Sequence, residues 1–306
     1  MISSYNIVTI LGPTATGKTQ LAALLSNKIN GEIISADSRQ IYRNMNLGTG
    51  KDYEDYTVGN KIIPFHLIDI KDAGYKYNVF EFQKDFLKSI HIIENNNSFP
   101  VLCGGTGLYI DAALKGYLLI EVPPDNNLRA SLAEKSLAEL TAILKTYKSI
   151  HNTTDVDTTK RAIRAIEIEE YYKFQKEEIK PYPKFNSLII GINCERNLRR
   201  QRITDRLKKR ISDGLIDEVE TLLKNGLSSE DLIYYGLEYK FITEYLNGKY
   251  TFDDFFQQLE TAIHQFAKRQ MTYFRGMERK GTKIHWIDCT IPNEEKTELI
   301  LKLLSH

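Results

Sequence analysis

The sequence predicts an α/β fold in which a mostly parallel sheet is flanked by helices and carries a small inserted helical domain. Short β-branched runs alternate with longer segments of helical periodicity, the pattern of strand–helix–strand units. A glycine-rich turn follows the first run, and a helical stretch bounded by prolines interrupts the alternation later on. We therefore expect residues 1–120 and 186–306 to form one core, and residues 121–185 to form the insert.

The first predicted strand, Ile7 to Leu11, leads directly into the turn Gly12-Pro13-Thr14-Ala15-Thr16-Gly17-Lys18-Thr19. This turn matches the G-x-x-x-x-G-K-[ST] phosphate loop, and the leucines after it predict the helix that such a loop needs. Backbone N–H groups of the loop would converge on phosphate oxygens, Lys18 would add charge, and Thr19 would help to hold Mg²⁺. The core is therefore expected to resemble P-loop NTPases and to bind a ligand with linked phosphates, which leaves ATP open.

Two further turns come at the ends of predicted strands. Asp37-Ser38-Arg39-Gln40 follows the strand at residues 32–36, and Gly104-Gly105-Thr106-Gly107 follows the strand at residues 100–103. Ligands of open α/β sheets gather at the carboxyl ends of strands, so both turns are well placed to face the ligand of the phosphate loop. The plainer alternative for Asp37, Ser38 and Thr106 is that they cap helices.

The insert is bounded by Pro123-Pro124-Asp125 and by Pro181-Tyr182-Pro183, and its leucines recur at helical spacing. Lys160, Arg161 and Arg164 lie within one predicted turn there, which fits either a solvated basic face or contact with RNA. A strand at residues 187–192 then returns to the sheet.

The segment 195–212 predicts a helix with an apolar stripe beside a ridge of arginines, Arg199, Arg202, Arg206 and Arg210. Such a ridge is suited to clamp a diphosphate or a polynucleotide backbone. Another long helix, from Phe252 to about Arg275, has an aromatic stripe that predicts a core face. A last strand at residues 284–288 and an amphipathic helix end the chain.

Composition limits the classes of function. The 306 residues carry a net charge of +1, which excludes a globally basic nucleic-acid wrapper and leaves only local basic faces. Cys103, Cys194 and Cys289 are far apart and have no C-x-x-C spacing, so we predict neither a zinc site nor a disulfide framework, and a reducing compartment. No segment resembles a signal peptide or a membrane span. We expect a cytoplasmic monomer.

Several motifs together resemble the tRNA dimethylallyltransferase (tRNA isopentenyltransferase) family. They run in order from residue 7 to about 275. The phosphate loop is shared with many kinases and NTPases, whereas the second strand motif and the GGTGLY turn are far more specific. The matching stretches are residues 12–19, Glu32 to Tyr42, Asn46 to Lys51, His66 to Asp69, Gly104 to Tyr109 and Ala267 to Gln270.

The resemblance implies transfer of a dimethylallyl group from dimethylallyl diphosphate to N6 of adenosine 37, beside the anticodon of tRNAs that read codons starting with U. It implies Asp37 as general base, Thr106 near the transferred carbon, and Arg206 at the departing diphosphate. Thr19 would contact diphosphate and Mg²⁺. The implied contacts with the anticodon stem-loop are Asp37, Ser38, Arg39, Gln40, Thr106, Arg129, Lys160, Arg161, Ala162, Ile163 and Arg164.

Four positions depart from the family pattern, namely Asp52, Glu238, Phe241 and His264. They bear on which tRNAs are modified more than on the chemistry. Three alternatives remain open on the residues alone. They are a P-loop kinase of small metabolites, a prenyltransferase that acts on free adenine nucleotides, and an RNA-binding module without catalysis.

Overall fold

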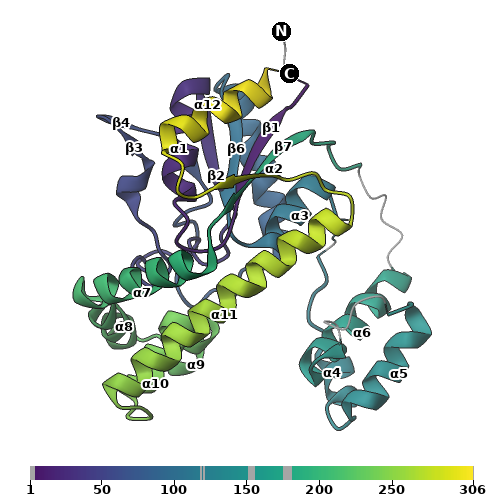
Figure 1. The fold of residues 1–306 in the computed structure, drawn as a ribbon. Helices are drawn as coiled ribbons and strands as arrows, with labels where there is room; N and C mark the ends of the chain where they lie inside the picture. Colours follow the sequence, from purple (N-terminus) through teal and green to yellow (C-terminus); the bar gives the residue numbers. More distant parts are fainter. Residues whose placement is uncertain (1–3, 118, 120, 151–155, 175–180, 306) are drawn as a thin grey trace. The chain divides into compact units, whose positions relative to one another are not determined.

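The computed structural model describes residues 4–117, 119, 121–150, 156–174 and 181–305 (Figure 1). The chain divides into two compact units. The first, called the core below, consists of residues 1–117 and 183–306. The second, called the insert, is the single stretch 118–182 that separates the two parts of the core.

The core is built on a six-stranded sheet in the order β5-β2-β6-β1-β7-β8, and every neighbouring pair is parallel. This confirms the predicted α/β class with a mostly parallel sheet. A separate antiparallel pair, β3 (Thr57–Val58) and β4 (Lys61–Ile62), has no counterpart in the prediction. The sheet strands are β1 (Ile7–Leu11), β2 (Gly31–Ser35), β5 (Phe65–His66), β6 (Phe99–Gly104), β7 (Ser187–Asn193) and β8 (His285–Asp288).

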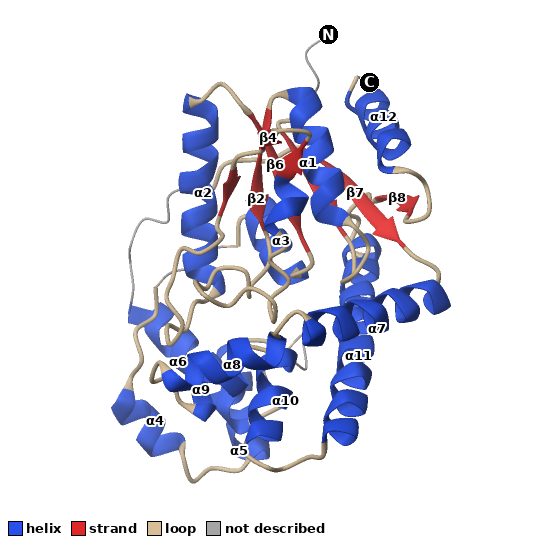
Figure 2. Ribbon diagram, turned by 90° about the vertical axis from the view of Figure 1, so that its left-hand side faces the viewer, coloured by secondary structure: helices blue, strands red, loops and turns tan. Residues whose placement is uncertain are grey.

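Helices cover both faces of the sheet, as Figure 2 shows. Successive residues of a strand point to opposite faces, and the side chains of β1 divide accordingly. Val8 and Ile10 join the apolar cluster under α1 (Lys18–Ile29) and α12 (Asn293–Leu304), whereas Ile7 and Leu11 join the cluster on the other side. That second cluster also takes in α2 (Val79–Asn95) and α3 (Gly107–Lys115).

Five helices lie between β7 and β8 in the chain. They extend the apolar cluster that contains Ile7 and Leu11 beyond the sheet. The prediction anticipated the first and the last of them. It missed the three short helices between, because six to ten residues give too few repeats for a clear helical period. The five are α7 (Arg196–Ser212), α8 (Leu215–Lys224), α9 (Ser229–Tyr234), α10 (Leu237–Leu246) and α11 (Phe252–Arg279).

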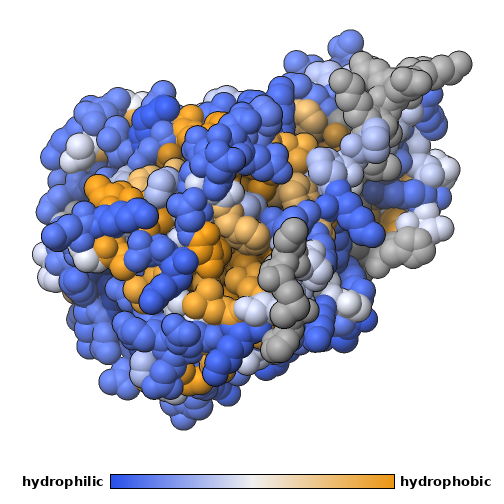
Figure 3. Space-filling model, turned by 90° about the horizontal axis from the view of Figure 1, so that it is seen from above, coloured by the Kyte–Doolittle hydropathy of each residue, from blue (hydrophilic) through white to orange (hydrophobic). Residues whose placement is uncertain are grey.

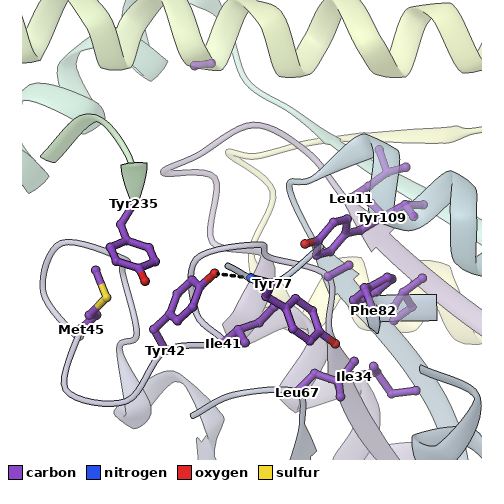
Figure 4. Packing of buried hydrophobic residues seen from close by; sticks show 14 of the residues in the cluster. Leu11, Ile34, Ile41, Tyr42, Met45, Leu67, Tyr77, Phe82, Tyr109 and Tyr235 are labelled. Atoms are coloured by element: carbon purple, nitrogen blue, oxygen red, sulfur yellow. Dashed lines mark hydrogen bonds between the residues drawn. The ribbon is translucent and has the colours of Figure 1, made fainter. Parts of the chain in front are cut away.

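Aromatic side chains tie the long loop after β2 to the helices around it (Figure 4). The N–H of Tyr77 donates to the hydroxyl oxygen of Tyr42 at 3.2 Å, and the ring of Tyr42 packs edge-on against Tyr235, with centroids 4.5 Å apart. The rings of Phe82 and Tyr109 stack at 4.2 Å. The first two contacts therefore fix the loop relative to the C-terminal end of α9, and the Phe82–Tyr109 stack joins α2 to α3.

In the part of the insert that the structure describes, three helices surround a small apolar cluster, namely α4 (Asn126–Leu132), α5 (Leu137–Tyr147) and α6 (Thr159–Phe174). A buried carboxylate sits beside that cluster. Glu167 accepts two hydrogen bonds from the guanidinium of Arg129, each 2.9 Å, and pairs with Arg164. These two partners lower the pKa of Glu167 although burial opposes them. The carboxylate therefore links α4 to α6 as an ion.

The prediction of unpaired cysteines is wrong for two of the three. Cys194 directly follows β7 and Cys289 directly follows β8, and the two form a disulfide with Cα atoms 5.1 Å apart. The parallel register pairs Asn193 with Asp288, so the next residue of each strand lies beside the other. Residues 95 positions apart are brought together only by this strand pairing. Cys103 stays free and buried.

Polar side chains cover most of the face seen from above in Figure 3, and apolar side chains gather near its middle. Within the described ranges, no helix combines the length and the apolar character that crossing a lipid bilayer requires.

Candidate active site

A cavity of about 530 Å³ opens at the carboxyl ends of β1, β2 and β6. The three turns singled out from the sequence all line it, because β1 and β2 both pair with β6 and so end at the same edge. Residues from the phosphate loop, the Asp37 turn and the second glycine turn therefore share one space. Its charged lining residues are Lys18, Asp37, Arg39, Asp52, Asp55, Arg206, Arg210, Glu238 and Arg269.

The phosphate loop ends at Gly17, which has φ 76° and precedes the first residue of α1. That left-handed conformation favours glycine and turns the helix N-terminus toward the cavity. The ammonium of Lys18 donates to the carbonyl oxygen of Pro13 at 2.7 Å. Burial, assisted by the nearby Arg206, lowers the pKa of Lys18 to about 8. An anion bound in the loop would raise the pKa of Lys18 again, because it stabilises the charged ammonium. The position of Lys18 therefore suits a phosphate ligand.

The two glycine turns are held together by one side chain of α11. The Oε1 of Gln270 accepts the N–H of Thr14 at 3.0 Å, and its Nε2 donates to the carbonyl oxygen of Gly105 at 2.9 Å. The second turn also lies against β2, since a Cβ at Gly104 would stand 2.3 Å from the Ala36 carbonyl oxygen. Gln270 is 8% exposed, so both hydrogen bonds are shielded from water.

The turn after β2 is a compact polar unit. One carboxylate oxygen of Asp37 accepts the N–H of Arg39 at 2.9 Å, and the N–H of Ser38 donates to the hydroxyl of Thr106 at 3.1 Å. No helix begins directly after Asp37, and Thr106, although it stands at the N-cap position of α3, makes no side-chain hydrogen bond to that helix. The capping alternatives therefore do not account for these residues. Asp37 and Thr106 instead lie on two adjoining turns of the cavity wall.

The other residues of this turn have different neighbours. The Nε2 of Gln40 donates to the carbonyl oxygen of Gly50 at 3.0 Å, and its Oε1 accepts the hydroxyl of Ser35 at 2.9 Å. Gln40 therefore ties β2 to the loop that contains Gly50. Arg39 lies over the ring of Tyr234, with 5.5 Å between the guanidinium carbon and the ring centroid.

The predicted arginine ridge of α7 divides in two. Arg206 and Arg210 line the cavity, whereas Arg199 and Arg202 do not. The guanidinium of Arg206 donates to the hydroxyl of Thr14, and Arg210 pairs with Asp52 at 3.2 Å. Burial lowers the pKa of Arg206 to about 10, so its charge is complete at neutral pH. Helix α7 thus supplies two of the guanidinium groups that line the cavity of the phosphate loop.

The sequence did not predict the roles of two glutamates in or beside the cavity. Glu218 accepts the N–H groups of Asn46, Leu47 and Gly48 at 2.8–3.1 Å, and so fixes the loop that runs on to Gly50. Glu238 was noted only as a departure from the family, yet it lines the cavity. A lone glutamate in a helical segment carries no local signal of either role.

Comparison with known proteins agrees with this geometry. The model of the IPP transferase family matches residues 40–277, and that of the isopentenyl transferase family matches residues 5–63. The protein named tRNA dimethylallyltransferase 2 of Phocaeicola vulgatus is 60% identical over 99% of both chains. Its namesake from Bacteroides fragilis is 61% identical, again over 99% of each. The chain belongs to the tRNA dimethylallyltransferase family.

Solved structures with this fold include other members of the tRNA dimethylallyltransferase family. The tRNA isopentenylpyrophosphate transferase of Bacillus halodurans is 30% identical and has a TM-score of 0.72, over 99% of this chain and 96% of that one. A eukaryotic dimethylallyltransferase acting on tRNA has a TM-score of 0.78 at 22% identity, over 98% and 78%. That second likeness concerns the fold alone.

The insert positions that resemble tRNA contacts of the dimethylallyltransferase family differ in exposure. Lys160 and Arg161 are exposed on the first turn of α6, where Arg161 also pairs with Asp157. Arg129 and Arg164 hold Glu167, as described above. Ala162 is fully buried in the insert cluster, and Ile163 packs against it half-buried. Lys160 and Arg161 are therefore exposed to a partner, and the side chains of Arg129 and Arg164 are still 41% exposed while they pair with Glu167.

Proposed function

We propose that the protein transfers a dimethylallyl group from dimethylallyl diphosphate to N6 of adenosine 37 in tRNAs that read codons starting with U. The observation that carries this proposal is the shared cavity, in which a phosphate loop and the carboxylate of Asp37 face one space. A small-molecule kinase would account for the phosphate loop but would leave the insert without a purpose. Relatives about 60% identical are named tRNA dimethylallyltransferases, which supports transfer of a dimethylallyl group to tRNA.

The diphosphate end of the reaction is assigned to residues 12–19 and the two arginines of α7. An allylic carbon–oxygen bond breaks as the diphosphate leaves with the electron pair, so negative charge builds on its oxygens. Fixed positive groups lower the barrier by stabilising that charge. Lys18, Arg206 and Arg210 supply them within one buried cavity, where their charges act more strongly than in water.

The acceptor end is assigned to Asp37, with Ser38 and Thr106 beside it. The exocyclic amine is a weak nucleophile because its lone pair is delocalised into the ring. As N6 forms a bond to the allylic carbon, the Asp37 carboxylate would accept the amine proton, which is typically worth about 10²–10⁴ in rate. The adenosine would have to leave its stack to reach this depth, as other enzymes that modify bases require.

Mg²⁺ is expected with the diphosphate. The residues fit such an ion, because Mg²⁺ keeps several waters and is commonly held by one or two protein groups together with substrate phosphates. The Thr19 hydroxyl lines the cavity and would hold it. Among the residues that the structure describes, no group of three or more His, Cys, Asp or Glu side chains is arranged to hold a metal ion, so we do not propose a site made of protein ligands alone. When bound, the ion would neutralise charge on the leaving group.

The insert is proposed to contact the anticodon stem-loop through Lys160 and Arg161, and through Arg129 and residues 162–164 once α6 adjusts. Because the proposed substrate is tRNA, we place the reaction in the cytoplasm.

The decisive experiment incubates the protein with radiolabelled dimethylallyl diphosphate, Mg²⁺ and unmodified tRNA. We expect label in tRNA with adenosine at position 37 and none in a transcript with guanosine there. Parallel reactions contain free AMP as acceptor and ATP as phosphoryl donor. Label in AMP but not in tRNA would favour the free-nucleotide prenyltransferase, and phosphate transfer without prenyl transfer would favour the kinase.

A further inference from the structure

Glu238 brings a second carboxylate into the cavity beside the proposed general base. It lies in the first turn of α10, directly after Gly236 and Leu237, and lines the same space as Asp37, Arg206 and Arg210. Within the described residues its side chain forms no ion pair. A half-buried carboxyl group without a paired cation therefore shares the pocket that the proposed function assigns to a diphosphate.

The charges around Glu238 are unevenly matched. Arg210 has a partner in Asp52, but the guanidinium of Arg206 meets only the neutral hydroxyl of Thr14. Three carboxylates raise the pKa of Arg206, and Glu238 does so more strongly than Asp52 or Asp37. Burial raises the pKa of Glu238 itself, while the two arginines oppose that rise. Glu238 thus lines one cavity with both arginines, and among the described contacts it is hydrogen-bonded to neither.

We infer that Glu238 is an internal counter-ion of Arg206 and Arg210, which weakens their hold on a diphosphate and so speeds its release as product. This inference rests on the proposed function, which places the diphosphate at these arginines. A bound diphosphate balances the charge of the two arginines in place of Glu238. The carboxylate of Glu238 stays in the cavity and then repels the diphosphate. Glu238 therefore determines affinity and is not a group that touches the reacting atoms.

The test measures binding of inorganic pyrophosphate with Mg²⁺ to the full chain by titration calorimetry. Glu238→Gln removes the charge at nearly constant shape, and Glu238→Ala removes it by truncation. We expect pyrophosphate to bind both variants about tenfold more tightly than wild type, because one unit charge in a poorly hydrated site changes affinity by that order. Product inhibition by pyrophosphate should strengthen in the same proportion.

Glu230→Gln is the matched control, because Glu230 also lies in the first turn of a short helix, α9, but is exposed outside the cavity. Its pyrophosphate affinity should stay within about twofold of wild type, as for a screened surface charge. Glu238→Asp keeps the charge and should remain within about threefold, since only its reach changes. Thermal melting checks that each variant is folded.

Several outcomes would overturn the inference. Equal pyrophosphate affinity in wild type and in both charge-removing variants would show that Glu238 does not oppose the diphosphate. Weaker binding of pyrophosphate in the variants would show that Glu238 orients the arginines instead. A change confined to the KM for tRNA would show that Glu238 contacts the adenosine. If pyrophosphate bound neither wild type nor variants, the diphosphate site of the proposed function would itself fall.

Discussion

The side-chain oxygen of Gln270 accepts the backbone N–H of Thr14 at 3.0 Å, so a helix near the end of the chain fixes a loop near its beginning. The amide nitrogen of the same side chain donates to the carbonyl oxygen of Gly105. Gln270 thereby sets the spacing between the loop assigned to the diphosphate and the turn that carries Thr106.

Replacing Gln270 by methionine should keep the bulk of the side chain and remove both hydrogen bonds. Each buried polar group left unpaired costs about 1–3 kcal/mol, so we expect kcat/KM for the prenyl donor to fall about 10- to 100-fold. Gln257→Met, at an exposed position of the same helix, is the control. Unchanged kinetics with the donor would mean that the two turns keep their spacing without this bridge.

Asp37→Ala should separate binding from chemistry. Without the carboxylate the amine proton has no acceptor, so turnover should fall by about 10² or more, while tRNA binding stays within about tenfold. Single-turnover rates and filter binding measure the two quantities. Asp37→Asn can still accept the N–H of Arg39 and controls for loss of the turn. Turnover near the wild-type rate in either variant would remove Asp37 from the mechanism.

The lowered pKa of Lys18 predicts how activity depends on pH. With a pKa of about 8, the free enzyme carries the full Lys18 charge at pH 6 and loses it as the pH rises through 8. The value of kcat/KM reports ionisations of the free enzyme, so kcat/KM for the donor should decline above about pH 8. Lys18→Arg keeps its charge throughout and should lack this decline. An identical decline in that variant would assign it to another group.

Charge on the insert should affect only the RNA substrate. Lys160→Gln combined with Arg161→Gln should raise the KM for tRNA and reduce the salt slope of binding by about 2, because each phosphate contact contributes roughly one unit. Lys145→Gln, on an exposed part of α5, serves as the control. A changed KM for the prenyl donor in place of that for tRNA would contradict the assignment of the insert.

The sequence predicted those parts of the fold that depend on the pattern of neighbouring residues. The strand before the phosphate loop and the helix after it, Ile7–Leu11 and Lys18–Ile29, are where the residue pattern indicated. The turns at Asp37 and Thr106 were predicted to face one ligand, because ligands of open α/β sheets generally bind at the carboxyl ends of the strands. The structure brings both turns to one cavity.

What the sequence could not predict depends on contacts between distant residues. The pairing of Cys194 with Cys289 follows from the neighbouring positions of β7 and β8. In the sequence, nothing distinguishes Glu167 from the other charged residues of its helix. In the structure it is buried and pairs with two arginines. The ridge on α7 has a regular spacing, yet only packing decides that Arg206 and Arg210 turn inward while Arg199 does not.

The position of β1 between β6 and β7 has a consequence for the order of assembly on the ribosome. Its neighbour β6 is made early, whereas β7 follows β1 by more than half the chain, after the whole insert. Until β7 emerges, one edge of β1 has unpaired backbone N–H and C=O groups, and such edges can pair with other chains. Synthesis stalled within the insert should therefore yield aggregation-prone fragments, although the phosphate loop is already complete in them.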